Sequence, residues 1–525
     1  APGESAGRGR LRHPSLFSYS GDETMSSSSS KMSVTQLTML TALNMMGSGI
    51  IMLPTKLAEV GTFSVVSWLI TAGGSTALAY AFAKCGMLSR NKGGMGGYAE
   101  YAFGKSGSFL ANYAYCVSLL IANIAIAISA VGYGVAFFGA NPTPFETCLL
   151  TIAVLWICTV LNFKGAKITG LISNFSAWGV ILPVAGLSVF GWFWFSPSTY
   201  IESWNPNNLP AFEAVSASIS MTLWAFLGLE SACANSEAVD NPEKNVPKAV
   251  LGATLGVAVI YILSTNIAAG IVGNAELVQS TAPFGLVFST MFGDWAGKLV
   301  MGLMIISCSG SLLSWQFTIA RVFKSSADEG YFPKWFSKVT KDDAPVVGMT
   351  IIVAIQTVMS LMTISPSLYK QFNTLVDLAV VTNVMPYLLS MAAVYVMLKA
   401  EGVYGKAASA IKLCAFLGTV YSLYALYAAG FSAMMYGALA TFAGWFLYGI
   451  AAEKLHPAPA VQLSGAADHD HLALVVTPDR QRASEAQRPP QTPRISRRLA
   501  ALIRTGQAGA FVARVRKCRA QFGAK

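Results

Sequence analysis

Long apolar stretches recur along this chain, and they constrain its fold more than any other feature of the sequence. An apolar run of about 20 residues crosses a lipid bilayer as a helix. Hydrophobic residues make up 54% of the chain and charged residues only 12%, a balance typical of multi-pass membrane proteins. We therefore predict an all-α membrane protein with twelve transmembrane helices. The predicted spans are residues 34–55, 62–84, 106–135, 145–163, 168–195, 212–238, 249–272, 296–323, 347–364, 372–398, 409–429 and 432–451.

The positive charge of the chain is concentrated near its C-terminus. The formal net charge is +11, and residues 451–525 alone contain 13 Lys and Arg against 5 Asp and Glu. Of the 19 Lys and Arg in residues 32–450, 16 lie in alternate connections between the predicted spans. This asymmetry is that of cytoplasmic loops, and it predicts that both termini are cytoplasmic. Because the apolar part is nearly neutral, nucleic-acid binding is not expected of the protein as a whole.

The two ends of the sequence differ in composition from the apolar part. Residues 1–31 are rich in Gly and Ser, have no signal-peptide core and are expected to be disordered. Met25 or Met32 would be a natural start, so residues 1–24 are expected to be upstream sequence. Residues 454–525 form a basic tail that is expected to be disordered; the alternative is a basic amphipathic helix lying on anionic lipid. The region between them, 32–453, is the predicted transmembrane domain.

Two predicted spans are interrupted by small residues. The first contains Gly47, Ser48 and Gly49, and the sixth contains the stretch "WAFLGLESA" at residues 224–232. Such residues weaken a helix, and the backbone groups that a break frees are tolerated in lipid only where they line a cavity. Small residues also help helices to pack, which is the alternative explanation of a single break.

The two breaks occupy corresponding places in two halves of the chain. The first and sixth spans begin five-span halves at about 32–195 and 212–398, and two additional helices follow at about 409–451. Paired breaks of this kind indicate an inverted-repeat transporter with its site at the breaks. Backbone N–H groups of the first break are expected to bind a carboxylate, and carbonyls near Trp224 to Leu227 to accept hydrogen bonds from an ammonium group.

Glu230 is the one charged residue of 214–236, the middle of the predicted sixth span. A charged group near the bilayer centre costs roughly 2.5–3.5 kcal/mol on insertion scales and usually serves function. The span contains no Lys or Arg to pair with this acid. We therefore predict that its partner is a cationic substrate, a proton, or both in turn. The alternative is a protonated Glu that packs against a neighbouring helix through a hydrogen bond.

Aromatic residues in three spans are candidates for holding an ammonium group. Trp224 precedes Glu230 by six residues, Trp315 lies in the middle of the eighth span, and Trp445 and Tyr448 lie on one face of the twelfth. An indole face attracts an ammonium group by about 0.5–2 kcal/mol, depending on desolvation. For each of these residues the alternative is core packing or a belt at the membrane interface.

Three further polar residues complete the candidate set. Asn123 is the clear polar residue of the third span and is expected to line the same pocket. Asp377, near the start of the tenth span, is either an acid at the rim of the pocket or a surface charge. Glu100 belongs to the glycine-rich stretch 93–104, which we expect to be a flexible loop; it would either attract cations to the inner mouth or be a surface charge.

The sequence gives no indication of an enzyme, a cofactor or a metal site. The eight Cys are scattered without CxxC spacing, and neither a nucleophile–base pair nor a cofactor motif is found. All four His lie in the end segments, so none is placed to carry protons within the membrane; they are His13, His456, His469 and His471.

The apolar part of the chain, from about residue 32 to 451, resembles the amino acid–polyamine–organocation transporters. The resemblance lies in stretches that include "NMMGSGIIMLPTKLAEVG", "GGMGGYAEYAFGKSG", "MTLWAFLGLESACAN" and "FKSSADEGYFPK". It implies a LeuT-like fold, with an inverted five-plus-five repeat and two additional C-terminal helices, and it leaves a homodimer open. The resemblance further implies that the site at the middle of the membrane consists of Gly47, Ser48, Gly49, Asn123, Trp224, Glu230 and Trp315.

Within that family the chain is most similar to the polyamine branch, which implies further roles and substrates. The branch suggests roles for Cys85, Glu100, Trp445, Tyr448 and Glu453. It implies exchange of putrescine for ornithine across a bacterial cytoplasmic membrane, with proton-coupled putrescine uptake as a second mode. Lysine–cadaverine and arginine–agmatine exchange stay open, because one methylene is worth only about 1–3 kcal/mol of discrimination. Two other classes of protein stay open as well: a channel, for which no filter loop is seen, and a membrane receptor with a lipid- or nucleic-acid-binding tail.

Overall fold

The structure is a computed structural model, and it describes residues 33–47, 49–89, 91, 94–230, 241–362, 364 and 367–455. The regular structure within these ranges is helical throughout. Residues 1–31 and 456–525 of the expected disordered ends, with the four His, lie outside the described residues, whereas residues 454 and 455 continue the last described helix. The helices are α1 (Val34–Met46), α2 (Leu53–Val60), α3 (Val65–Leu88), α4 (Met95–Phe138), α5 (Pro144–Asn162), α6 (Ala166–Phe190), α7 (Pro197–Glu202), α8 (Ala211–Trp224), α9 (Pro242–Ile271), α10 (Asn274–Gln279), α11 (Pro283–Phe292), α12 (Asp294–Asp328), α13 (Val346–Met362), α14 (Leu368–Ala400), α15 (Gly405–Ala428) and α16 (Gly430–Leu455).

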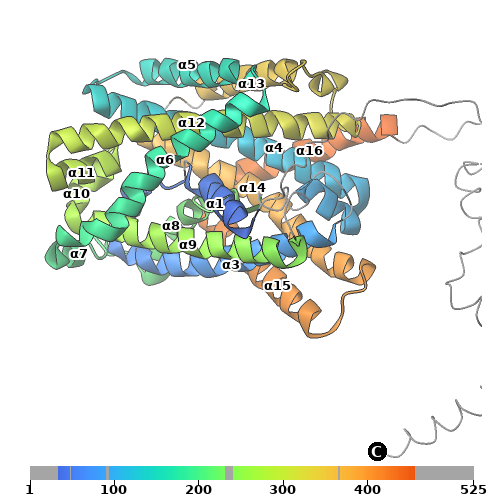
Figure 1. Ribbon diagram of the computed structural model, residues 1–525, viewed down its shortest axis with the longest axis horizontal. Helices are drawn as coiled ribbons and strands as arrows, with labels where there is room; N and C mark the ends of the chain where they lie inside the picture. The colour runs from blue at the N-terminus through green and yellow to red at the C-terminus, as the bar shows by residue number, and fades with distance from the viewer. Residues whose placement is uncertain are drawn as a thin grey trace, which may run out of the picture. The chain divides into compact units, whose positions relative to one another are not determined.

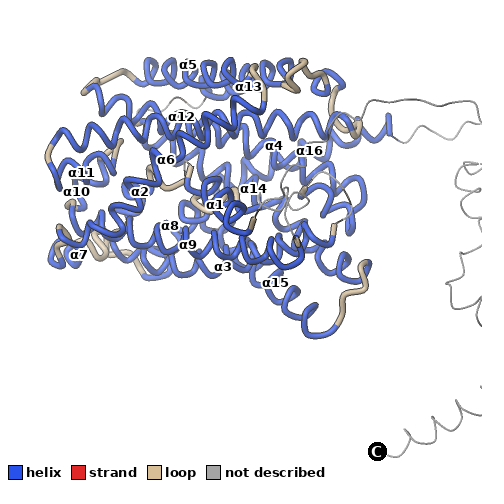
Figure 2. The backbone as a smooth tube through the Cα atoms, in the orientation of Figure 1, coloured by secondary structure: helices blue, strands red, loops and turns tan. Residues whose placement is uncertain are grey.

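Nine helices in the described part of the chain are long and apolar enough to cross a membrane. Each of the twelve predicted ranges contains helix. The three predicted spans that do not correspond to one of these nine helices are the first, the sixth and the ninth. The ninth corresponds to α13, which has only 17 residues, whereas the first and sixth are broken. Figure 2 shows that helix makes up nearly all of the drawn backbone and that the connections are short. The chain is a multi-pass membrane protein.

The helices around α4 form the centre of the bundle. Helix α4 packs most extensively against α14 and then against α12, which also contacts α6. Figure 1 shows α5 and α13 side by side along one edge and α15 at the opposite edge. Helix α1 lies in the interior of this view and packs mainly against α9. The buried residues of α1 are Leu37, Thr41, Met45 and Met46, so the helix is packed on one side and its burial is greatest next to the break.

The first span breaks between α1 and α2. Helix α1 begins at a capping box formed by Ser33 and Gln36 and ends at Met46, directly before Gly47. Helix α2 begins only at Leu53, with Pro54 in its first turn, where the fixed φ of proline suits a helix start. The interruption predicted from the small residues is confirmed, and it extends further along the chain than the three small residues themselves.

The sixth span breaks at the end of α8. This helix stops at Trp224 and is followed by turns, in which Gly228 has a φ of +107° that suits only glycine. A Cβ atom built on Gly49 would lie 2.8 Å from the Cα of Ala225, so the two breaks are in direct backbone contact. Residues 231–240, in which the sixth span continues, lie outside the described residues.

Tyrosine hydroxyls from other helices satisfy the carbonyl groups that the breaks free. The hydroxyl of Tyr261 on α9 donates to the carbonyl of Met45 at 2.9 Å and to that of Ala225 at 3.2 Å. The hydroxyl of Tyr133 on α4 donates to the carbonyl of Ile51 at 3.0 Å. Both tyrosines are fully buried, so the breaks are held by specific contacts inside the protein.

The glycine-rich stretch before the third span was expected to be a flexible loop, and that expectation is wrong. Helix α4 already begins at Met95, eleven residues before the predicted start of the span, and continues through Glu100. Gly104 has a φ of +62° and kinks the helix there. Glycine lowers helix propensity but does not forbid a helix, and buried contacts outweigh that cost between Met95 and Ala99.

Candidate functional site

Glu230 lies between α4 and α14 and is 7% exposed. Its carboxylate accepts hydrogen bonds from the hydroxyl of Tyr115 at 3.1 Å and from that of Tyr387 at 2.6 Å. It also accepts one from the backbone N–H of Gly228 at 3.1 Å. All three donors are neutral, and no Lys or Arg among the described residues forms an ion pair with this acid. The acid therefore has hydrogen-bond partners on neighbouring helices, as in the packing alternative, but no compensating charge.

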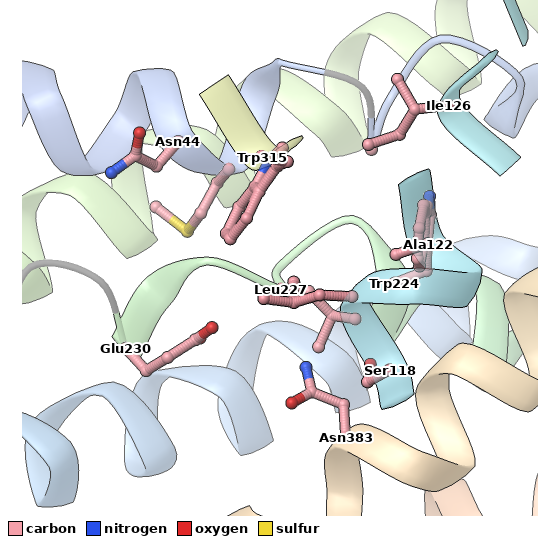
Figure 3. Close-up of a pocket in the computed structure, with 12 residues that line it drawn as sticks. Asn44, Ser118, Ala122, Ile126, Trp224, Leu227, Glu230, Trp315 and Asn383 are labelled. Carbon is pink, nitrogen blue, oxygen red and sulfur yellow. The ribbon is translucent and has the colours of Figure 1, made fainter. Parts of the chain in front are cut away.

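A narrow cavity lies beside this carboxylate (Figure 3). Its volume is about 30 Å³, which is room for one or two water molecules. Pockets that hold small molecules are about ten times larger, so this cavity is contracted and must widen to admit an organic substrate. Its lining comes from both broken spans and from α4, α12 and α14. The lining residues are Asn44, Met45, Gly49, Ser118, Leu119, Ala122, Ile126, Trp224, Leu227, Glu230, Trp315 and Asn383.

Four of the residues predicted from the sequence meet at this cavity: Gly49, Trp224, Glu230 and Trp315. In Figure 3, Trp315 lies on the side of Asn44, whereas Glu230 and Trp224 lie below it. The indole N–H of Trp224 is buried and has no hydrogen-bond partner among the described residues. Two aromatic side chains and one acid therefore line a single space.

Gly47 belongs to a second cavity of about 240 Å³ between α1, α6 and α12. The two cavities share Asn44 and Trp315. The wall of the second one is rich in hydroxyl groups, among them that of Ser307, which is buried without a partner among the described residues. Ser48 lies outside the described residues, and its predicted role stays a prediction.

The backbone groups at the breaks are less free than the sequence indicated. Helix α2 begins at Leu53, so the N-terminus of this half-helix lies beyond Gly49. The carbonyl of Trp224 accepts from the N–H of Leu227 at 3.2 Å, and that of Ala225 accepts from a tyrosine. Each carbonyl oxygen has a second lone pair, so an ammonium group could bind there only by sharing the oxygen with the donor already present. Such binding stays a prediction.

Asn123 is fully buried but does not line either cavity. Its amide nitrogen donates to Gln316 at 3.1 Å, and Gln316 donates to Gln356 at 2.6 Å. These amides connect α4, α12 and α13 directly beside Trp315. The structure thus places Asn123 behind the tryptophan, and direct contact with substrate stays a prediction.

The remaining predicted residues lie apart from the cavity lining. Trp445 on α16 is 50% exposed, and the ring of Tyr448 packs 5.4 Å from that of Phe109. Cys85 is buried in α3, and Glu453 is exposed near the end of α16. The resemblance alone implied roles for Cys85 and Glu453, and the functional roles of all four residues stay predictions.

The two other predicted acids have different surroundings. Asp377 on α14 accepts a hydrogen bond from Ser220 on α8 at 2.7 Å. Glu100 lies near the C-terminal end of α12, where burial, and after it the negative charge of Glu100, raise the pKa of Glu329. Asp377 therefore joins the two spans that carry Trp224 and Tyr387, whereas Glu100 belongs to a separate acidic pair.

Four residues of the site were not predicted from the sequence: Tyr115, Tyr387, Asn44 and Asn383. The two tyrosines are 115 and 157 residues from Glu230 in the chain, and no spacing connects them to it. The two asparagines are polar residues in apolar spans, which is the same signal that singled out Asn123. That signal finds buried amides but does not show which of them face a cavity.

A buried acid and an indole at paired helix breaks, with a second indole on α12 facing the same cavity, define a carrier of small solutes inside a multi-pass helical bundle. Residues 32–450 match the amino acid permease family, and the chain belongs to this family. The predicted family and the prediction of a transporter, as opposed to an enzyme, are thereby confirmed.

Curated relatives place the chain more closely within this family. It is 67% identical to "Putrescine transporter PotE" of Haemophilus influenzae over 430 residues, which is 82% of this chain and 99% of the relative. It is 66% identical to the protein of the same name in Escherichia coli K12 over 426 residues, 81% and 97% of the two chains. It is also 31% identical to "Cadaverine/lysine antiporter" of Escherichia coli K12 over 408 residues, 76% and 90% of the two chains.

Proposed function

We propose that the protein is a secondary active transporter that exchanges putrescine for ornithine across a bacterial inner membrane. The observation that carries this proposal is the buried carboxylate of Glu230, which lines a cavity and whose hydrogen-bond partners among the described residues are all neutral. The two relatives named as putrescine transporters support the diamine, and the one named as an antiporter supports exchange. Proton-coupled uptake of putrescine is a second mode of the same site.

The binding site acts by charge compensation. An ammonium group beside Glu230 supplies the positive charge that the two tyrosines do not. Trp224 and Trp315 enclose the methylene chain and attract the ammonium groups through their ring faces. A contracted cavity of about 30 Å³ holds too little water to solvate a free carboxylate. The site therefore changes from opening on one side of the membrane to opening on the other most readily with a cation bound. This requirement couples export of one amine to import of another.

The proposed topology has twelve spans, with both termini in the cytoplasm. Spans one to five and six to ten form the inverted repeat, spans eleven and twelve follow it, and residues 1–31 and 454–525 are extensions of this domain. The contacting breaks in the first and sixth spans support the repeat. Alternating access then moves spans one, two, six and seven against the others. A homodimer is the assembly that the family resemblance allows, and light scattering of the purified protein tests it.

Exchange of lysine for cadaverine is the second candidate, because the relative of that name is 31% identical. Exchange of arginine for agmatine is the third candidate, with a longer amine and its parent amino acid. Counterflow into proteoliposomes, with each diamine and its parent amino acid inside and outside in turn, separates the three. Putrescine and ornithine are expected to give the highest initial rates, and a higher rate for either other pair would replace this assignment.

The substitution Glu230→Gln tests the mechanism. It keeps the size of the side chain and removes the charge, so putrescine counterflow is expected to be lost while the protein still inserts and purifies as a single species. Glu213→Gln is the matched control, because Glu213 is an exposed acid in the first turn of α8. The control is expected to transport normally. Full transport by Glu230→Gln would remove this acid from the mechanism.

A further inference from the structure

We propose that Asn383 forms the subsite for the second ammonium group of a diamine. The inference rests on the proposed function, which assigns the first ammonium group to Glu230. Asn383 lies on α14, lines the cavity and is 2% exposed. Its side-chain carbonyl oxygen has no hydrogen-bond partner among the described residues. Figure 3 shows the amide nitrogen of Asn383 turned toward the middle of the cavity, whereas the oxygen that lacks a donor is turned away from it; a half-turn of the amide brings this acceptor to the cavity.

An unpaired buried acceptor is costly, and native proteins rarely keep one without a reason. Leaving a buried acceptor unpaired costs about 1–3 kcal/mol. A substrate N–H that reaches this oxygen would remove the penalty in the loaded state only. Ser118, also in the lining, donates its hydroxyl hydrogen to the carbonyl of Ala379 at 2.8 Å, so its oxygen retains an acceptor site. Two neutral acceptors therefore belong to the same wall.

The position of Asn383 on its helix fits a diamine bound to Glu230. Asn383 is four residues before Tyr387, which holds the Glu230 carboxylate, so both lie on one face of α14. Four residues of an α-helix rise about 6 Å. This length is comparable to the separation of the two nitrogens in a short extended diaminoalkane. In Figure 3 the amide of Asn383 and the carboxylate of Glu230 lie on the same side of the cavity, opposite Trp315.

An amide at this position also suits exchange between a diamine and an amino acid. A second carboxylate would bind a diamine but repel the carboxylate of a basic amino acid. An amide accepts from an ammonium group through oxygen and donates to a carboxylate through nitrogen. Asn383 therefore suits both the diamine and the amino acid, at the end of the molecule where one has an ammonium group alone and the other also has a carboxylate.

Competition between a diamine and a monoamine measures this subsite. The protein in proteoliposomes takes up labelled putrescine by counterflow, and unlabelled putrescine or n-butylamine is added as inhibitor. The readout is the ratio of the n-butylamine to the putrescine concentration that halves uptake. This ratio does not depend on the amount of folded protein. In Asn383→Leu it is expected to fall by about 10- to 100-fold, because a hydrogen bond to a charged group is lost for the diamine alone.

Two more variants make the result decisive. Asn373→Leu is the matched control, because Asn373 lies on the same helix and also has an unpaired carbonyl oxygen but does not line the cavity. Its ratio is expected to match that of the unmodified protein. Asn383→Asp keeps the acceptor and the size and adds a negative charge beside the second ammonium group, so its ratio is expected to rise.

The outcomes separate this inference from the proposed function. An unchanged ratio in Asn383→Leu, or a ratio in Asn383→Asp that does not rise, would overturn the subsite. Absence of putrescine counterflow in the unmodified protein would overturn the proposed function instead. If Asn383→Leu does not purify as a single species, the ratio in Asn383→Asp still decides.

Discussion

Replacing Gly49 by alanine tests whether the two broken helices meet as the structure has them. The added Cβ would lie 2.8 Å from the Cα of Ala225 and 3.1 Å from its carbonyl oxygen. Ordinary contact begins at 3.4 Å, so the two breaks would have to separate by about 0.6 Å, the difference between the two distances. The atoms in the way belong to the backbone and cannot rotate aside as a side chain would.

The magnitude follows from overpacking at this contact. An added methyl group in a well-packed core costs about 1–3 kcal/mol. Separating the breaks also lengthens the 3.2 Å bond from Tyr261 to the carbonyl of Ala225. If the penalty falls on the closed form through which every cycle passes, the exchange rate is expected to drop by about 5- to 150-fold.

The assay is the initial rate of putrescine counterflow per amount of single-species protein. Gly73→Ala is the matched control, because a Cβ at Gly73 in α3 meets nothing within 4 Å. The control is expected to keep the rate of the unmodified protein. A normal rate and normal thermal stability in Gly49→Ala would refute the backbone contact. An equal loss in Gly73→Ala would show that any glycine replacement harms the protein, and the steric argument would fail.

Three other substitutions test separate parts of the site. Tyr387→Phe removes the 2.6 Å hydrogen bond to Glu230 and is expected to raise the KM for putrescine about 10-fold, measured by counterflow, with little effect if the bond only packs the helices. Tyr261→Phe removes the donor shared by both breaks and is expected to lower stability by about 1–3 kcal/mol, seen as a lower Tm of the purified protein. Trp224→Leu is expected to weaken binding of putrescine and ornithine alike; unchanged half-saturation for both would assign the indole to packing.

The helices could be predicted from the sequence because lipid leaves the backbone few options. A chain within a bilayer must satisfy its own N–H and C=O groups, so an apolar run of sufficient length is a helix. Boundaries were less certain, as the early start of α4 at Met95 shows. The first turns of α4 precede the apolar run, and the packing of these turns determines where the helix begins.

The candidate site could be predicted in part, and there is a physical reason why some of its residues were found from the sequence and others were not. Glu230, Trp224 and Trp315 stand out because an acid or an indole in mid-span is unusual by residue type alone. Tyr115 and Tyr387 are not unusual in that sense, and only the packing of α4 against α14 brings them to the carboxylate. Asn123 and Asn383 carry the same signal in the sequence, yet one faces other amides and the other a cavity.

The tyrosine hydroxyls around the breaks fall into two groups with different acceptors. Tyr261 and Tyr133 bind carbonyl oxygens and thereby fix where the broken helices lie, whatever the cavity contains. Tyr115 and Tyr387 bind the carboxylate oxygens and share their charge, but a neutral donor does not cancel it. A bound ammonium group or a proton cancels that charge, because each adds a positive unit at Glu230. In the proposed mechanism, exchange and proton coupling are two results of one requirement, that the acid be compensated whenever the breaks are in contact.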